Sequence, residues 1–200
     1  MRVDPTCHDV LLLSAFAVTL AFIVASGKPL AKQAAPSTSA APQSAVERGK
    51  YLVTIGGCHD CHTPKKMGPN GPESDMSRAL AGHPQDMKIT APPNPPPAEP
   101  WVIATNPTLT AWSGPWGVSF AANLTPDQKT GMGMWTEEMF IKAIRTGKHM
   151  GMSRPILPPM PWQDYAAMTD DDLKAVFAYL RSIPPLVNVV PLPIPPAGAK

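Results

Sequence analysis

Five consecutive residues carry the chemistry that this sequence offers: Cys58, His59, Asp60, Cys61 and His62. Two cysteines three positions apart on a helical turn point to the same side, so both thiols can reach the two vinyl groups of one haem. The histidine directly after the second cysteine then brings its imidazole under the iron. The C-x-x-C-H spacing therefore predicts one covalently attached haem c, with thioethers at Cys58 and Cys61 and with His62 as the proximal iron ligand.

Two other uses of a C-x-x-C pair compete with this interpretation. A zinc ribbon needs a second pair of cysteines, and the only cysteine left is Cys7. A thioredoxin-like dithiol needs a βαβ context, and no strand pattern surrounds the motif. His59 lies inside the motif, turned away from the iron by its position, and is expected to be a solvated side chain. No paired-carboxylate, Ser/His or glycine-loop arrangement competes with the haem, so we predict no catalytic residue.

The ligand on the other side of the iron decides what such a haem does. A methionine thioether closes the iron and raises its reduction potential, whereas an open position permits catalysis or gas binding. Met160 stands in a Pro-Pro-Met-Pro run, where the prolines stiffen the loop and can hold one sulfur in place. We therefore predict Met160 as the distal iron ligand. The alternatives are two expected surface histidines and two methionines in a looser stretch: His83, His149, Met150 and Met152.

Composition narrows the class of protein. Of the 200 residues, 44% are hydrophobic and 16% charged, and the formal net charge is +2. These values exclude a coiled coil, a charge-driven disordered chain and the basic footprint of a nucleic-acid binder. Proline is frequent, with 27 residues, and limits regular structure because it lacks a backbone donor. Three cysteines cannot form a disulfide scaffold.

Capping signals predict three helices around the motif. Ser44 and Glu47 form a capping-box pattern at the start of the first helix, and three aspartates open the last. The predicted ranges are 45–55, 136–147 and 169–183, with a short helical turn over 163–167. No segment alternates long enough to predict a strand. We therefore expect an all-α fold, in which short helices and long proline-rich loops wrap around one haem.

The motifs in their order resemble the class I c-type cytochromes, above all the cytochrome c domains of membrane-bound alcohol and gluconate dehydrogenase cytochrome subunits. The shared motifs are C-x-x-C-H, G-P-W-G at 114–117, N-L-T-P-D at 123–127, T-G-x-G-x-W at 130–135, P-x-M-P at 158–161 and A-Y-L-R-S at 178–182. The resemblance implies helices packed around a haem, the first and last crossing near Gly49 and Tyr179. It also implies these thioether and iron ligands: Cys58, Cys61, His62 and Met160. Those subunits usually carry three such domains, where this chain shows one motif.

The amino-terminal region indicates export. Val10 to Ala25 is a largely apolar run, shorter than the roughly 20 residues of a bilayer span and suited to a signal-peptide core. The parts expected along the chain are a signal peptide or membrane anchor at 1–27, an Ala/Pro/Ser-rich linker at 28–44, a cytochrome c domain at 45–191 with a proline-rich insertion at 64–100, and an extended tail at 192–200. Cleavage and retention of the apolar run are both left open. The expected location is the periplasm or the outer face of the cytoplasmic membrane.

The expected function is one-electron transfer, without enzymatic activity of the chain itself. The donor would be a dehydrogenase or a quinol-oxidising complex, and the acceptor a downstream protein such as a terminal oxidase. From Ala45 onward the chain has 14 Lys and Arg against 13 Asp and Glu, so strong electrostatic steering of partners is not expected. The alternatives are an electron-relay subunit of a dehydrogenase complex and an open-site catalytic or gas-sensing haem domain.

Overall fold

The computed structural model describes residues 43–91 and 102–196. The predicted signal peptide or anchor at 1–27 lies outside the described residues, as does almost all of the predicted linker at 28–44. Residues 92–100 of the predicted insertion and 197–200 of the predicted tail lie outside them too. Among the described residues, no helix combines the length and apolar character needed to span a bilayer.

The three predicted helices are present as α1 (Ala45–Ile55), α3 (Glu137–Thr146) and α5 (Asp170–Ser182). Each begins after a side chain that accepts a hydrogen bond from a backbone N–H of the first turn; these caps are Ser44, Thr136 and Thr169. Gly147 ends α3 with φ 63°, in the left-handed region that glycine favours. The three helix predictions are confirmed. They could be made from the sequence because the capping residues stand directly at the ends of each helix.

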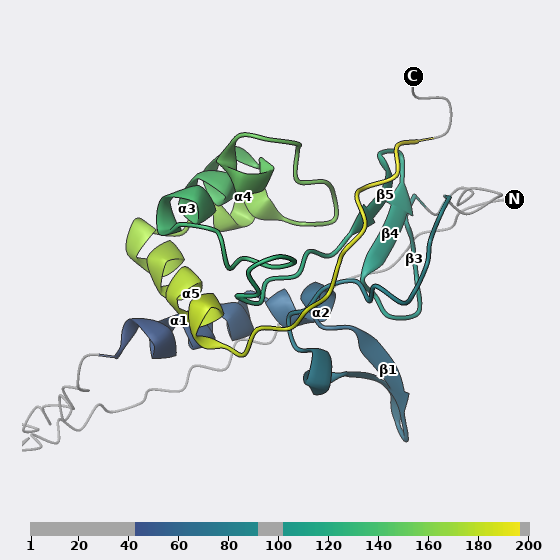
Figure 1. Ribbon diagram of the computed structural model, residues 1–200, viewed down its shortest axis with the longest axis horizontal. Helices are drawn as coiled ribbons and strands as arrows, with labels where there is room; N and C mark the ends of the chain where they lie inside the picture. The colour runs from purple at the N-terminus through teal and green to yellow at the C-terminus, as the bar shows by residue number, and fades with distance from the viewer. Residues whose placement is uncertain (1–42, 92–101, 197–200) are drawn as a thin grey trace, which may run out of the picture. The chain divides into compact units, whose positions relative to one another are not determined.

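Helices α1 and α5 cross at a glycine (Figure 1). A Cβ at Gly49 would lie 1.9 Å from the Ala175 carbonyl oxygen and 2.8 Å from the Tyr179 Cβ. Any side chain there would force the helices apart. The crossing implied near Gly49 and Tyr179 is therefore confirmed.

Helix α3 and the short helix α4 (Trp162–Tyr165) pack beside this pair. Phe140 of α3 stacks on Phe177 of α5 with the ring centroids 5.4 Å apart. The ring of Trp162 covers Gly147, where a Cβ would come within 2.3 Å of it. The buried apolar core consists of Leu52, Val53, Leu80, Met132, Phe140, Ile144, Leu173, Ala175, Val176, Phe177 and Leu180.

Short strands correct the expectation of an all-α fold. Strand β1 (Lys65–Gly68) pairs antiparallel with β2 (Gly71–Ser74). A second antiparallel sheet contains β3 (Ala104–Thr105), β4 (Ala111–Gly114) and β5 (Gly117–Phe120) in that order. Runs of two to four residues are too short for an alternating pattern to be recognised, which is why the sequence predicted none.

The carboxy-terminal segment after α5 lies along the domain and reaches the second sheet (Figure 1). Ile194 pairs with Val118 of β5 through two backbone hydrogen bonds of 2.7 and 2.9 Å. Before that, the buried Asn188 donates from Nδ2 to the carbonyl oxygens of Ala81 and His83, at 2.6 and 2.9 Å. The segment thus joins the loop that contains Ala81 and His83 to strand β5, two parts of the chain that are distant in sequence.

Candidate haem site

The motif residues form the short helix α2 (Cys58–His62) directly after α1. The Gly56 N–H donates to the Leu52 carbonyl oxygen at 2.8 Å and closes α1. Gly57, with φ 66°, then turns the chain into α2. Cys58 and Cys61 are free thiols on this one turn of helix, the arrangement that two thioether bonds to one haem need.

The surroundings of the two thiols do not suit a redox dithiol. Burial raises the pKa of Cys58 to about 11, and burial followed by the charge of Asp60 raises the pKa of Cys61. Reactive dithiols and zinc ligands require thiolates, which need a lowered pKa. Among the described residues, no three His, Cys, Asp or Glu side chains gather as a metal site. Within the described residues, the structure thus shows no feature specific to a zinc site or a redox dithiol.

His62 is buried and its orientation is fixed by one hydrogen bond. Its Nδ1 lies 2.8 Å from the Ala122 carbonyl oxygen, and since a carbonyl only accepts, Nδ1 carries the hydrogen. The lone pair then lies on Nε2, which has no hydrogen-bond partner within the described part of the chain. Burial lowers the pKa of His62 and favours the neutral ring, the form that binds a metal.

His59 is half-buried, which differs from the solvated side chain we expected. Its Nδ1 lies 2.8 Å from the Thr63 hydroxyl, which also accepts the Leu80 N–H at 3.0 Å. The side chain therefore helps to hold the loop that leaves α2.

Met160 lies in the loop that leads into α4. Its side chain is partly buried and packs against the apolar core, as do Cys58, Leu124 and Tyr165. Its N–H donates to the Leu157 carbonyl oxygen at 3.3 Å. The structure thus brings this thioether and the first motif cysteine to the border of one apolar cluster, and its ligation to iron stays a prediction.

His83, an alternative ligand that we expected at the surface, is fully buried. Its Nε2 donates to the Met87 carbonyl oxygen at 2.9 Å, and its Nδ1 lies 3.0 Å from the Thr110 hydroxyl. The expectation was wrong because the polar partners that permit this burial lie on other segments. With both nitrogens engaged, His83 has none free for iron.

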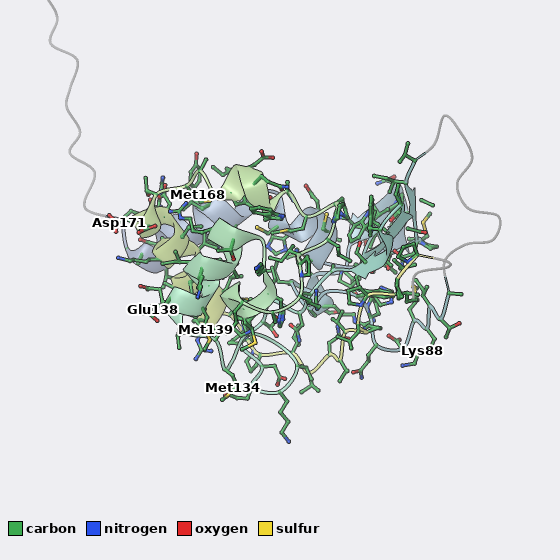
Figure 2. All side chains as sticks on the ribbon, turned by 90° about the horizontal axis from the view of Figure 1, so that it is seen from above. Lys88, Met134, Glu138, Met139, Met168 and Asp171 are labelled. Atoms are coloured by element: carbon green, nitrogen blue, oxygen red, sulfur yellow. The ribbon has the colours of Figure 1, made fainter. Side chains whose placement is uncertain are left out.

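The remaining alternatives have less suitable surroundings. His149 is half-buried, with Nδ1 3.3 Å from the Ser153 hydroxyl and its ring edge-on to Trp135. Met152 is exposed, and so is Met134, labelled in Figure 2, with 68% of its surface accessible. Met150 is held at φ 54° within a 3-10 turn.

Two hydroxyl contacts near Met160 were not predicted. Tyr165 donates to the Gly56 carbonyl oxygen at 2.5 Å and so ties α4 to the turn before α2. Ser119 of β5 donates to the Pro158 carbonyl oxygen at 2.5 Å. Each pair is far apart in sequence, so no local pattern indicates it; the G-P-W-G motif next to Ser119 was the only signal available.

The chemical groups present fit a covalently bound haem c. Two uncommitted thiols, an imidazole with a free Nε2 and a thioether at the border of an apolar core supply the donors that the group requires. The acceptor of the imidazole N–H is a backbone carbonyl, the usual partner that fixes a metal-binding histidine.

Comparison with known proteins gives the same indication. A cytochrome c family model matches residues 46–184. The chain is 28% identical over 170 residues to the fructose dehydrogenase cytochrome subunit of Gluconobacter japonicus, covering 85% of this chain and 28% of that protein. It is 28% identical over 146 residues to the gluconate 2-dehydrogenase cytochrome c subunit of Pantoea cypripedii, covering 73% and 25%.

A third relative is the cytochrome c subunit of the quinone-dependent alcohol dehydrogenase of Gluconobacter oxydans. It is 26% identical over 139 residues, covering 70% of this chain and 21% of that protein. The matches thus span between 21% and 28% of the length of these relatives.

Proposed function

Because the chain belongs to the cytochrome c family and binds haem c covalently, we propose that it carries single electrons from a dehydrogenase to a downstream acceptor such as a terminal oxidase. The observation that carries this proposal is the geometry of α2, where two free thiols precede a histidine with its Nε2 uncommitted. The bound iron supplies a reversible one-electron couple. The chain supplies attachment, orientation and exclusion of water.

The proposed roles of the site residues follow from their surroundings. Cys58 and Cys61 form the thioethers, and His62 is the proximal ligand, held in one tautomer by the Ala122 carbonyl. Met160 is the distal ligand. A thioether is a soft, uncharged ligand that favours Fe(II) and leaves no open position for a substrate, which suits a carrier rather than an enzyme.

A spectroscopic experiment tests these roles. The purified protein should contain one haem with two thioethers, and Cys58→Ser should leave one, as read from the pyridine haemochrome spectrum. The oxidised protein should show a methionine-to-iron charge-transfer band that Met160→Ala removes and the control Met152→Ala retains. A band that survives in Met160→Ala would show that another residue binds the iron, and strong carbon monoxide binding by the reduced wild type would favour an open-site haem domain.

The partner is proposed from the relatives, which are named as cytochrome subunits of fructose, alcohol and gluconate dehydrogenases. We infer that a dehydrogenase catalytic subunit donates the electrons. This likeness also favours a second form of the function, a relay subunit that stays within such a complex. Purification of the native protein distinguishes the two: a stoichiometric dehydrogenase subunit indicates a relay, and a chain isolated alone indicates a mobile carrier.

The proposed location is the periplasm or the outer face of the cytoplasmic membrane. The apolar run at 10–25 supports it, together with the attachment of haem c outside the cytoplasm. Fractionation of the cells tests it, and the mass of the recovered haem-bearing protein shows whether residues 1–27 are removed or retained. A full-length chain recovered with haem in the cytoplasmic fraction would contradict the location.

A further inference from the structure

Residues 158–161, which include Met160, donate no backbone hydrogen bond to another segment; the nearest such donor in the loop is the Ile156 N–H, which bonds the Gly147 carbonyl oxygen at 2.8 Å. Pro158, Pro159 and Pro161 have no N–H to donate. The one amide among these four residues, that of Met160, donates within the loop to the Leu157 carbonyl oxygen. Backbone hydrogen bonds between these four residues and the rest of the domain must therefore use donors on other segments.

The β4–β5 hairpin provides such a donor. The Ser119 hydroxyl lies 2.5 Å from the Pro158 carbonyl oxygen, two residues before Met160. The Trp116 Nε1–H donates to the same hydroxyl oxygen at 3.2 Å, so the hydroxyl hydrogen is directed to a carbonyl. The other carbonyl in reach, that of Trp112, is 3.5 Å away. Ser119 is buried, and Figure 1 shows the loop between α3 and α4 extending toward β5.

We propose that Ser119, oriented by Trp116, is a positioning residue for the Met160 loop, so that the β4–β5 hairpin controls how readily the distal side of the iron opens. This inference rests on the proposed role of Met160 as the distal ligand. It gives the G-P-W-G motif a function, because its tryptophan orients the serine that follows three residues later.

The size of the effect follows from a population argument. An external ligand binds the iron only in the fraction of molecules whose loop has moved away, so its apparent affinity rises in proportion to that fraction. Loss of a buried hydrogen bond of this kind shifts the opening equilibrium by about tenfold, which corresponds to about 1.4 kcal/mol.

The experiment measures imidazole binding to the oxidised, haem-bearing full-length protein by absorption spectroscopy. We expect Ser119→Ala to raise the apparent affinity about tenfold, with the charge-transfer band and haem content of wild type in the absence of imidazole. Trp116→Phe keeps an aromatic side chain, although a smaller one, and removes the N–H donor; it should raise the affinity by a smaller factor, about threefold.

The matched control is Ser113→Ala on β4. Ser113 is as buried as Ser119, with 8% against 7% exposure, and its hydroxyl makes no hydrogen bond within the described residues. The affinity of the Ser113→Ala protein for imidazole should stay within about twofold of that of wild type. Equal effects of Ser113→Ala and Ser119→Ala would overturn the inference, because they would indicate general weakening of the sheet.

Failure of the inference and failure of the proposed function give different results. Suppose that Met160→Ala loses the charge-transfer band, but Ser119→Ala and Trp116→Phe bind imidazole with the affinity of wild type. This result overturns the positioning role alone. A charge-transfer band that persists in Met160→Ala overturns the axial assignment and the positioning role together. If Ser119→Ala does not fold, Trp116→Phe decides between these outcomes.

Discussion

At the scale of single residues, Tyr165 fastens the segment after Met160 to the entrance of the haem-attachment helix. Its hydroxyl donates to the Gly56 carbonyl oxygen at 2.5 Å, across 109 positions of sequence. Burial raises its pKa to about 12, so the hydroxyl keeps its hydrogen at neutral pH. The contact joins the two halves of the chain that supply the proposed iron ligands.

We predict that Tyr165→Phe destabilises the haem-bearing protein by about 1–2 kcal/mol, since the partner carbonyl loses its donor while the ring stays in place. The measurement is urea unfolding followed by far-UV circular dichroism. Tyr179→Phe is the matched control, because the Tyr179 hydroxyl makes no hydrogen bond within the described residues, and it should cost less than about 0.5 kcal/mol. Equal losses in the two variants would contradict the role of the Tyr165 hydroxyl.

The residues that carry the chemistry could be predicted better than those that hold them. Cys58, Cys61 and His62 stand in one short motif whose spacing is the signal. Ser119 and Ala122 act on partners 39 and 60 positions away, so no local pattern shows that they belong to the site. The burial of His83 was missed for the same reason.

At the scale of elements, the contact between α1 and α5 depends on Gly49. We predict that Gly49→Ala destabilises the protein by about 3 kcal/mol or more, because the new methyl group would overlap the Ala175 backbone. Thermal unfolding of the haem-bearing protein measures this. The neighbouring exposed Lys50 provides the control, and Lys50→Ala should change stability by less than about 0.5 kcal/mol. A Gly49→Ala protein as stable as wild type would mean that the helices do not approach this closely.

The same pair of helices is joined by an ion pair that should depend on pH. The Arg48 Nε lies 2.9 Å from the Asp172 Oδ1, and this hydrogen bond lowers the pKa of Asp172 below its usual value of 3.8. A lowered folded-state pKa contributes stability above the unfolded value, and the contribution is lost as the pH falls through the folded value. Asp172→Asn should therefore be less stable than wild type near neutral pH and approach it in acid.

Urea midpoints at about pH 7 and about pH 3 measure this difference. Asp171→Asn is the control: Asp171, labelled in Figure 2, pairs with Lys174 at 3.8 Å, but its side chain is 95% exposed, and exposed pairs contribute little to stability. A difference between wild type and Asp172→Asn that is as large in acid as at neutral pH would contradict the ion pair.

The strands show what limited prediction at this scale. Both hairpins turn through a Gly-Pro-x-Gly run, at 68–71 and at 114–117. Proline favours the first central position of a turn, and glycine is common at its last position. The repeated run was thus a local signal for two hairpins, and the strands on either side are too short to add a second one.

At the scale of the whole domain, long loops are held by buried polar side chains rather than by regular structure. Asn188 is the clearest case: it donates to the Ala81 and His83 carbonyl oxygens and accepts the Gln85 N–H at 3.0 Å. Composition indicated long proline-rich loops, but the partners that order them are set by the fold.

We predict that Asn188→Ala destabilises the protein by about 3 kcal/mol, because it leaves three backbone groups without partners. The shift in the urea midpoint of the haem-bearing protein measures the effect. The control is Val187→Ala at the exposed neighbouring residue, which should leave the urea midpoint at the wild-type value within error. If Asn188→Ala lowers the urea midpoint no more than Val187→Ala does, the carboxy-terminal segment does not order the loops it touches.

The scarcity of backbone donors around Met160 has a consequence for measuring motion. Among residues 158–161, Met160 alone has an amide hydrogen, and that hydrogen is bonded to the Leu157 carbonyl oxygen. Solvent can exchange it only when this bond breaks. The isotope-exchange rate of that one hydrogen therefore follows the opening of the loop, without any added ligand for the iron.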